Sequence, residues 1–157
     1  MPEFRKDPII GRWVIVATER ARRPTDFVPH SVSEEKMAEP PCPFCEGKED
    51  QTPQPEIFAI RNPGTKPISP GWKVRVVPSV SPVLKIEGKI ERHGRGIYDV
   101  INGIGAHEII VETPDDRQLW DLGVDEIATV LGVYRDRIDA LSREPDINYV
   151  TVFKNHG

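Results

Sequence analysis

Several short stretches of the chain alternate apolar and polar side chains, with the two-residue period that is typical of β-strands. The clearest is 72–78, in which Trp72, Val74 and Val76 share one face. Lys73 and Arg75 occupy the opposite face. β-branched and aromatic residues predict further strands over 12–18, 56–61, 107–112 and 148–153.

A longer stretch, 124–143, has the periodicity of an amphipathic helix. Acidic residues occupy its first turn and Arg143 its last, where their charges suit the helix dipole. Pro145 ends the helix. The predicted apolar stripe consists of Ile127, Leu131, Tyr134, Ile138 and Leu141.

Glycine and proline are concentrated between these elements, as is typical of loops and turns. We expect loops over 25–54 and 87–105, the second of them mobile, and turns over 62–71. Several strands, one helix and a further strand indicate an α+β fold, with the helix packed on a largely antiparallel sheet.

The composition narrows the class of protein. The chain has 157 residues, enough for one domain or for half of a larger protein, and 38% of them are hydrophobic. Its net charge of −4 argues against a nucleic-acid partner. No apolar run has the length of a membrane helix and no signal-peptide core is present, so we expect a cytoplasmic protein without membrane contact.

Two cysteines carry the clearest chemical signal. Cys42 and Cys45 form a Cys-x-x-Cys pair in the proline-rich loop, and two thiolates at this spacing can take adjacent corners of a zinc tetrahedron. The pair supplies half of a zinc site, so histidine or carboxylate ligands must come from elsewhere. A redox dithiol or two inert cysteines are the alternatives, although a thioredoxin-type pair should open a helix after a strand.

A cluster of arginines follows the first predicted strand. Arg20, Arg22 and Arg23 offer bidentate donors that match phosphate oxygens. A solvated basic turn is the alternative explanation, and the favoured one for the cluster taken alone.

Other polar residues are weaker candidates. His107 begins a predicted strand, where a hydrogen-bonded structural histidine is more common than a ligand. Asp116 follows Asp115 in a sequence typical of a turn, although both offer oxygen donors. Asn155 is most simply a turn residue near the C-terminus.

Taken together, these segments resemble galactose-1-phosphate uridylyltransferases, a family of the histidine-triad superfamily. The resemblance covers nearly the whole chain, is strongest for the bacterial and archaeal branch, and extends to plant enzymes that act on ADP-sugars. The matching motifs, in order, are DPIIGRWVIVATERARRP (7–24), CPFCEG (42–47), GWKVRVVPSVSPVL (71–84), GIGAHEIIVETPDD (103–116), YRDRI (134–138) and YVTVFKNHG (149–157).

The resemblance implies a half-barrel-like fold and a ping-pong mechanism. A histidine of a His-x-His segment attacks the α-phosphorus of UDP-glucose and releases glucose 1-phosphate, and the uridylyl group then passes to galactose 1-phosphate. The family further implies bound zinc and a homodimer in the full-length protein.

Individual residues take family roles by position. Arg20 and Arg23 match phosphate-contacting arginines, and Asn155 matches the asparagine before the phosphate loop. Cys42 and Cys45 match two zinc ligands, and Phe44 between them corresponds to a side chain near the nucleoside.

The sequence departs from the family pattern at three places. Ser79 replaces a nucleoside-contacting asparagine, and Asp116 stands where the family has its third zinc ligand, a histidine. Asp116 can bind zinc through its carboxylate, with His107 as the alternative ligand. The four histidines include no His-x-His pair, so we expect the nucleophile, and the fourth zinc ligand, beyond Gly157.

We therefore expect residues 1–157 to be the truncated N-terminal domain of a hexose-1-phosphate uridylyltransferase, inactive by itself. Ser79 keeps open an alternative, an ADP-sugar phosphorylase or adenylyltransferase of the same superfamily. A zinc-stapled binding module without catalysis is a further alternative.

Overall fold

The structure is a computed structural model, and it describes residues 2–17 and 42–155. Over these residues the chain forms seven strands and one α-helix, with a 3-10 helix at Glu49–Gln51 and another at Leu119–Asp121. The strands are β1 (Glu3–Lys6), β2 (Trp13–Val16), β3 (Phe58–Arg61), β4 (Trp72–Pro78), β5 (Arg92–Arg95), β6 (Tyr98–Asn102) and β7 (Glu108–Val111), and the helix is α1 (Val124–Ser142).

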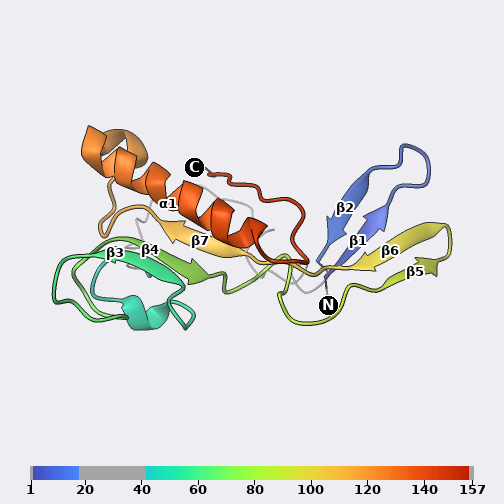
Figure 1. The fold of residues 1–157 in the computed structure, drawn as a ribbon, viewed down its shortest axis with the longest axis horizontal. Coiled ribbons are helices and arrows are strands. Elements are labelled where there is room, and N and C mark those ends of the chain that lie inside the picture. The colour runs from blue at the N-terminus through green and yellow to red at the C-terminus, as the bar shows by residue number, and fades with distance from the viewer. Residues whose placement is uncertain (1, 18–41, 156–157) are drawn as a thin grey trace, which may run out of the picture.

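The strands form two sheets, both with antiparallel pairing. One has the order β2-β1-β6-β5 and the other the order β3-β4-β7. Figure 1 places the four-stranded sheet at one end of the molecule, away from α1, and the three-stranded sheet beneath the helix at the other end. The predicted α+β class, with one long helix and antiparallel sheets, is confirmed.

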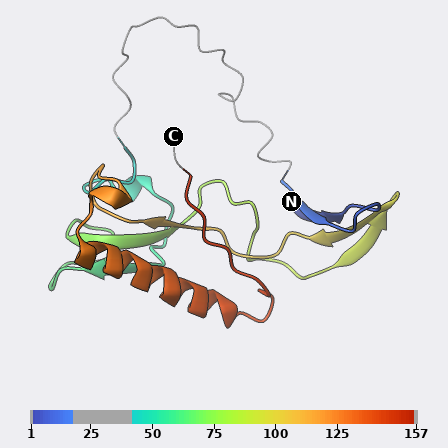
Figure 2. The ribbon, with the colours of Figure 1, turned by 90° about the horizontal axis from the view of Figure 1, so that it is seen from above.

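The core lies between α1 and the three-stranded sheet, along whose face the helix runs (Figure 2). Val74 and Val76 of β4 pack there against Val130 and Val133 of α1, and all four are at most 2% exposed. The helix ends one residue before the predicted end, but the predicted stripe is partly wrong, because Leu131 is 53% exposed. The buried positions Val130 and Val133 are three residues apart, whereas the predicted stripe placed Leu131 four residues after Ile127. A helix with 3.6 residues per turn places residues at both spacings on one face, so the period alone does not choose between them.

The opposite face of β4 is also covered. Arg75 and Val77 are both fully buried, whereas Lys73 is exposed. The Arg75 guanidinium donates to Glu56 Oε2 at 2.7 Å and to Thr52 Oγ1 at 3.1 Å. Residues 52–56 therefore cover the second face of this strand, and charged groups replace the apolar contacts that such a face usually makes.

The predicted mobile loop over 87–105 is wrong. The segment contains the β5–β6 hairpin, in which Arg95 and Tyr98 are paired across a two-residue turn. Gly96 begins that turn with a φ of 62°, a left-handed conformation that favours glycine. The glycines that suggested a loop thus include one that makes a tight hairpin possible.

The predicted strand over 148–153 is also wrong. In the described part of the chain this segment forms no ladder with any strand, and Tyr149 and Phe153 are 83% and 69% exposed. Alternation of side chains favours extended backbone, but a strand also needs a neighbour with which to pair. Strands were correctly predicted at β2, β3, β4 and β7, and β1 was missed because its four residues, EFRK, have little apolar character.

Candidate functional site

The cysteine loop, Cys42–Gly47, is fixed to two other segments of the chain. The Glu46 amide donates to the Pro114 carbonyl at 2.7 Å, and the Glu46 carboxylate accepts from the Gly71 amide at 2.6 Å. Lys48 Nζ donates to the Cys42 carbonyl at 3.3 Å. The loop therefore lies beside the turn that follows β7 and beside the turn that precedes β4.

The two thiols in this loop lie within hydrogen-bonding contact and differ in acidity. Burial acts to raise the pKa of Cys42, but hydrogen bonds from the Phe44 and Cys45 amides and from the Cys45 thiol, with the charge of Lys48, lower the pKa overall. The hydrogen bond to Cys42 is the main cause that raises the pKa of Cys45, followed by burial and nearby negative charge. Cys42 is thus the acceptor and Cys45 the donor, and both bear the soft sulfur donors that zinc prefers.

Asp116 lies near enough to Cys45 for its charge to contribute to the raised pKa of that thiol. Among the described residues, however, no three His, Cys, Asp or Glu side chains are close enough together to hold a metal ion. The described chain therefore provides a thiol pair suited to zinc and a neighbouring carboxylate, but not a complete ligand set.

His107 lies at the other end of β7. Its carbonyl accepts from the Ser79 amide at 2.9 Å, and its Nδ1 accepts from the Val83 amide at 3.2 Å. The Ser79 hydroxyl accepts from the Ser81 amide at 3.3 Å. The structure thus brings Ser79 close to His107 and separates both from the turn that carries Asp116.

Glu112, directly after β7, connects this strand to α1 and to the C-terminal segment. The Tyr134 hydroxyl donates to one oxygen of its carboxylate, and the Lys154 ammonium is paired with the other. Burial, together with the hydrogen bond to Glu112, raises the pKa of Tyr134. Asn155, exposed and next to Lys154, is therefore held near the end of β7 that also contacts the cysteine loop.

Of the other three predicted site residues, the structure describes one. Phe44 is half-buried within the cysteine loop. Arg20 and Arg23 lie outside the described residues.

Three glutamates of this region were not predicted: Glu49, Glu56 and Glu112. The side chains of Glu56 and Glu112 are 6% and 11% exposed, and Glu49 is buried as a residue. Each accepts from residues distant in the sequence. Glu56 and Glu112 lie at the ends of predicted strands, whereas Glu49 lies in a predicted loop and offered no signal.

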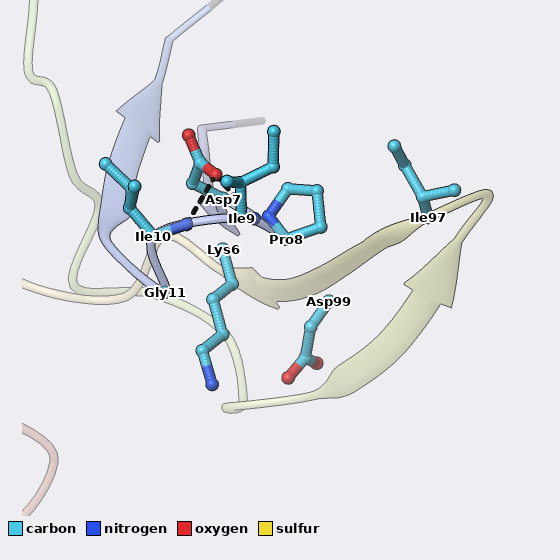
Figure 3. Close-up of a pocket in the computed structure, with 8 residues that line it drawn as sticks. All are labelled: Lys6, Asp7, Pro8, Ile9, Ile10, Gly11, Ile97 and Asp99. Carbon is cyan, nitrogen blue, oxygen red and sulfur yellow. Dashed lines mark hydrogen bonds between the residues drawn. The ribbon is translucent and has the colours of Figure 1, made fainter.

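A hollow of about 470 Å³ lies elsewhere, on the four-stranded sheet (Figure 3). In that view the Asp7 carboxylate accepts from the Ile9 and Ile10 amides within the β1–β2 turn. The hollow shares no lining residue with the cysteine loop, and its lining consists of Lys6, Asp7, Pro8, Ile9, Ile10, Gly11, Ile97 and Asp99. We assign it no part in the site.

An α+β fold of this kind occurs in solved structures of an ADP-glucose phosphorylase, a uridylyltransferase and a GalT-like protein. The chain is 32% identical in sequence to an ADP-glucose phosphorylase from Arabidopsis thaliana crystallised with bound ADP-glucose, with a TM-score of 0.53 over 95% of this chain and 41% of that one. A uridylyltransferase structure is 26% identical, with a TM-score of 0.58 over 94% of this chain and 37% of that one. A GalT-like protein from Arabidopsis thaliana is 30% identical, with a TM-score of 0.55 over 93% and 38% of the two chains.

In sequence, the chain is 36% identical to the ADP-glucose phosphorylase of Arabidopsis thaliana over 159 aligned residues, which cover 99% of this chain and 44% of that protein. The chain thus spans less than half the length of this curated relative. No protein-family model matches it. These similarities support the predicted relation to the superfamily of uridylyltransferases and ADP-sugar phosphorylases, and they do not single out galactose-1-phosphate uridylyltransferase.

The described residues include no helix with the length and apolar character needed to cross a lipid bilayer.

Proposed function

We propose that the protein containing this chain is an ADP-sugar phosphorylase, which cleaves a nucleoside diphosphate sugar with inorganic phosphate. The observation that carries this proposal is the 36% identity to ADP-glucose phosphorylase across 99% of the chain. The similarity to the structure with bound ADP-glucose supports the same substrate class.

The proposed reaction has two displacements. A histidine nitrogen attacks the α-phosphorus and forms a P–N bond, while the bond to the sugar 1-phosphate oxygen breaks. A phosphate oxygen then attacks the same phosphorus, the P–N bond breaks, and ADP leaves. The 157 residues contain no His-x-His pair, so the proposal assigns the nucleophile to another part of the protein.

Within this chain, we assign Arg20, Arg23 and Asn155 to the phosphate groups of the substrate. Guanidinium and amide donors stabilise the negative charge that shifts among phosphoryl oxygens in the transition state. The ion pair between Lys154 and Glu112 supports a position of the neighbouring Asn155 near the end of β7.

Zinc is a second part of the proposal, with Cys42, Cys45 and Asp116 as three of its ligands and a fourth ligand supplied by another part of the full-length protein. A structural zinc ion would clamp the cysteine loop to the turn after β7, which already contact each other through Glu46 and Pro114. Elemental analysis of protein purified without chelators should find about one zinc ion per chain at this site, as expected for a closed structural site. Absence of zinc, or zinc that survives substitution of both cysteines, would count against this assignment.

Uridylyl transfer from UDP-glucose to galactose 1-phosphate is the second candidate function, and the similarity to a uridylyltransferase structure favours it. A homodimer, expected for that family, belongs to the same proposal and is testable by sedimentation of the full-length protein.

Substrate pairs separate the candidates. With the full-length protein, release of glucose 1-phosphate from ADP-glucose and inorganic phosphate supports the phosphorylase. Faster exchange between UDP-glucose and galactose 1-phosphate supports the uridylyltransferase, and no turnover with either pair supports a non-catalytic binding module.

Ser79 provides a matched variant for this comparison. If the shorter side chain disfavours uridine, Ser79→Asn should increase the use of UDP-glucose relative to ADP-glucose by about fivefold, the equivalent of one neutral hydrogen bond. An unchanged ratio would remove Ser79 from the nucleoside site.

A further inference from the structure

Glu49 is a buried residue whose carboxylate contacts the last residue of the cysteine loop. It is 4% exposed and begins the 3-10 helix that follows the loop. Its Oε1 accepts from the Gly47 amide at 3.0 Å and from the Trp72 indole at 2.7 Å. One carboxylate oxygen thus joins the end of the cysteine loop to the first residue of β4.

Burying a carboxylate has a large desolvation cost unless hydrogen bonds and charges compensate for it. Here two donors compensate for that cost: the indole of Trp72, a side chain that is 2% exposed, and the amide of Gly47, whose φ of 88° favours glycine. The carboxylate is therefore buried where it links the end of the cysteine loop to β4.

Glu49 is one of several ties that act on the loop without a metal ion. Glu46 binds the segments at Gly71 and Pro114, and Lys48 binds the Cys42 carbonyl. The tie through Glu49 differs because it is buried and is anchored in the core. A buried polar contact of this kind restricts movement more than an exposed one does.

We propose that Glu49 is a positioning residue for the cysteine pair, and that it fixes the loop that carries Cys42 and Cys45 before any metal binds. The inference rests on the proposal that Cys42 and Cys45 bind zinc. Outer contacts that orient metal ligands commonly change metal affinity by about 10- to 100-fold when they are removed.

The test compares Glu49→Ala, Glu49→Gln and Asp50→Asn in the metal-free full-length protein. Glutamine keeps an oxygen that can accept from both donors, whereas alanine leaves the Trp72 indole without its acceptor. Asp50 is the matched control, since it carries the same charge on the same short helix and is exposed. Thermal unfolding first establishes which variants are folded, and Glu49→Gln alone is used if the alanine variant is not.

Two readouts are measured. Titration with Co²⁺, followed by its thiolate charge-transfer absorption and then by competition with zinc, gives metal affinity. Hydrogen exchange of the Gly47 amide without metal reports on the loop itself.

We expect Glu49→Ala to weaken metal affinity about 10-fold or more and to accelerate Gly47 exchange. Glu49→Gln should show a smaller loss of metal affinity and a smaller acceleration of Gly47 exchange. Asp50→Asn should match the wild type in both measurements. If Glu49→Gln is the only folded Glu49 variant, a measurable loss of affinity in it is still required. Equal affinity in the wild type and the Glu49 variants, or an equal loss in Asp50→Asn, would overturn the inference. A wild-type protein without thiolate–cobalt absorption would overturn the proposed metal site, and Gly47 exchange would still decide whether Glu49 positions the loop.

Discussion

At the scale of single residues, buried glutamates join segments that are far apart in the sequence. Glu56 pairs with Arg75 at 2.7 Å and with Arg61 at 2.6 Å, and the Arg75 side chain is fully buried. A buried ion pair contributes little net stability, but removing one partner leaves the other charge buried without compensation. Loss of Glu56 should therefore destabilise the protein more than loss of one partner in an exposed ion pair.

Glu56→Gln should lower the free energy of unfolding by about 3 kcal/mol, because Arg75 keeps its charge and loses its counter-charge. Urea denaturation of the wild type and the variant measures the difference. Asp136→Asn is the control. The side chains of Asp136 and its partner Arg135 are 51% and 79% exposed, so their ion pair should contribute less than about 1 kcal/mol to the free energy of unfolding. Similar losses in the two variants would contradict this account of the Glu56 network.

Glu49 should make stability depend on pH. Burial acts to raise its pKa, but hydrogen bonds from Trp72 and Gly47 and the charge of Arg75 lower the pKa below the ordinary value of 4.5. A lowered pKa means that the stabilisation is present above pH 4.5 and is lost as the pH falls through the folded-state value.

Glutamine does not titrate, so the free energy of unfolding of metal-free Glu49→Gln should fall less than that of the wild type when the pH drops below 4.5. Denaturation series at several pH values measure the two slopes. Parallel slopes would mean that Glu49 has the same pKa in the folded and unfolded chains.

At the scale of elements, side-chain period predicted where strands and the helix lie, but not always what they contact. The bounds of β4 agree with the prediction, and those of α1 differ by one residue. The buried helix face was predicted less well, because Val130 and Val133 pack inward while Leu131 does not. Period alone identifies an apolar side of a helix, whereas the line of closest approach depends on the opposing strand.

Val133→Ala tests which face of α1 is packed. Val133 is fully buried, so loss of two methyl groups should lower the free energy of unfolding by about 2 kcal/mol. Leu131→Ala, at a position that is 53% exposed, should change it by less than about 0.5 kcal/mol. A larger loss in Leu131→Ala than in Val133→Ala, measured by chemical denaturation, would favour the stripe predicted from the sequence.

At the scale of the whole molecule, three contacts join the cysteine loop, the end of β7, α1 and the C-terminal segment. Glu46 joins the loop to Pro114, and Glu112 joins β7 to both Tyr134 and Lys154. The motifs predicted that Cys42, Cys45 and Asn155 serve one site, but not the glutamates that bring their segments together. Such contacts connect distant segments, and no local pattern in the sequence encodes them.

The chain spans 44% of the length of its phosphorylase relative, so the proposed reaction is tested on the full-length protein. The most direct measurement is single-turnover labelling with ADP-glucose or UDP-glucose carrying radioactive α-phosphate, without an acceptor. The account predicts a covalent, acid-labile label on the protein that forms faster from ADP-glucose and disappears when inorganic phosphate is added. A protein that takes up no covalent label from either nucleotide sugar, although it binds them, would contradict it.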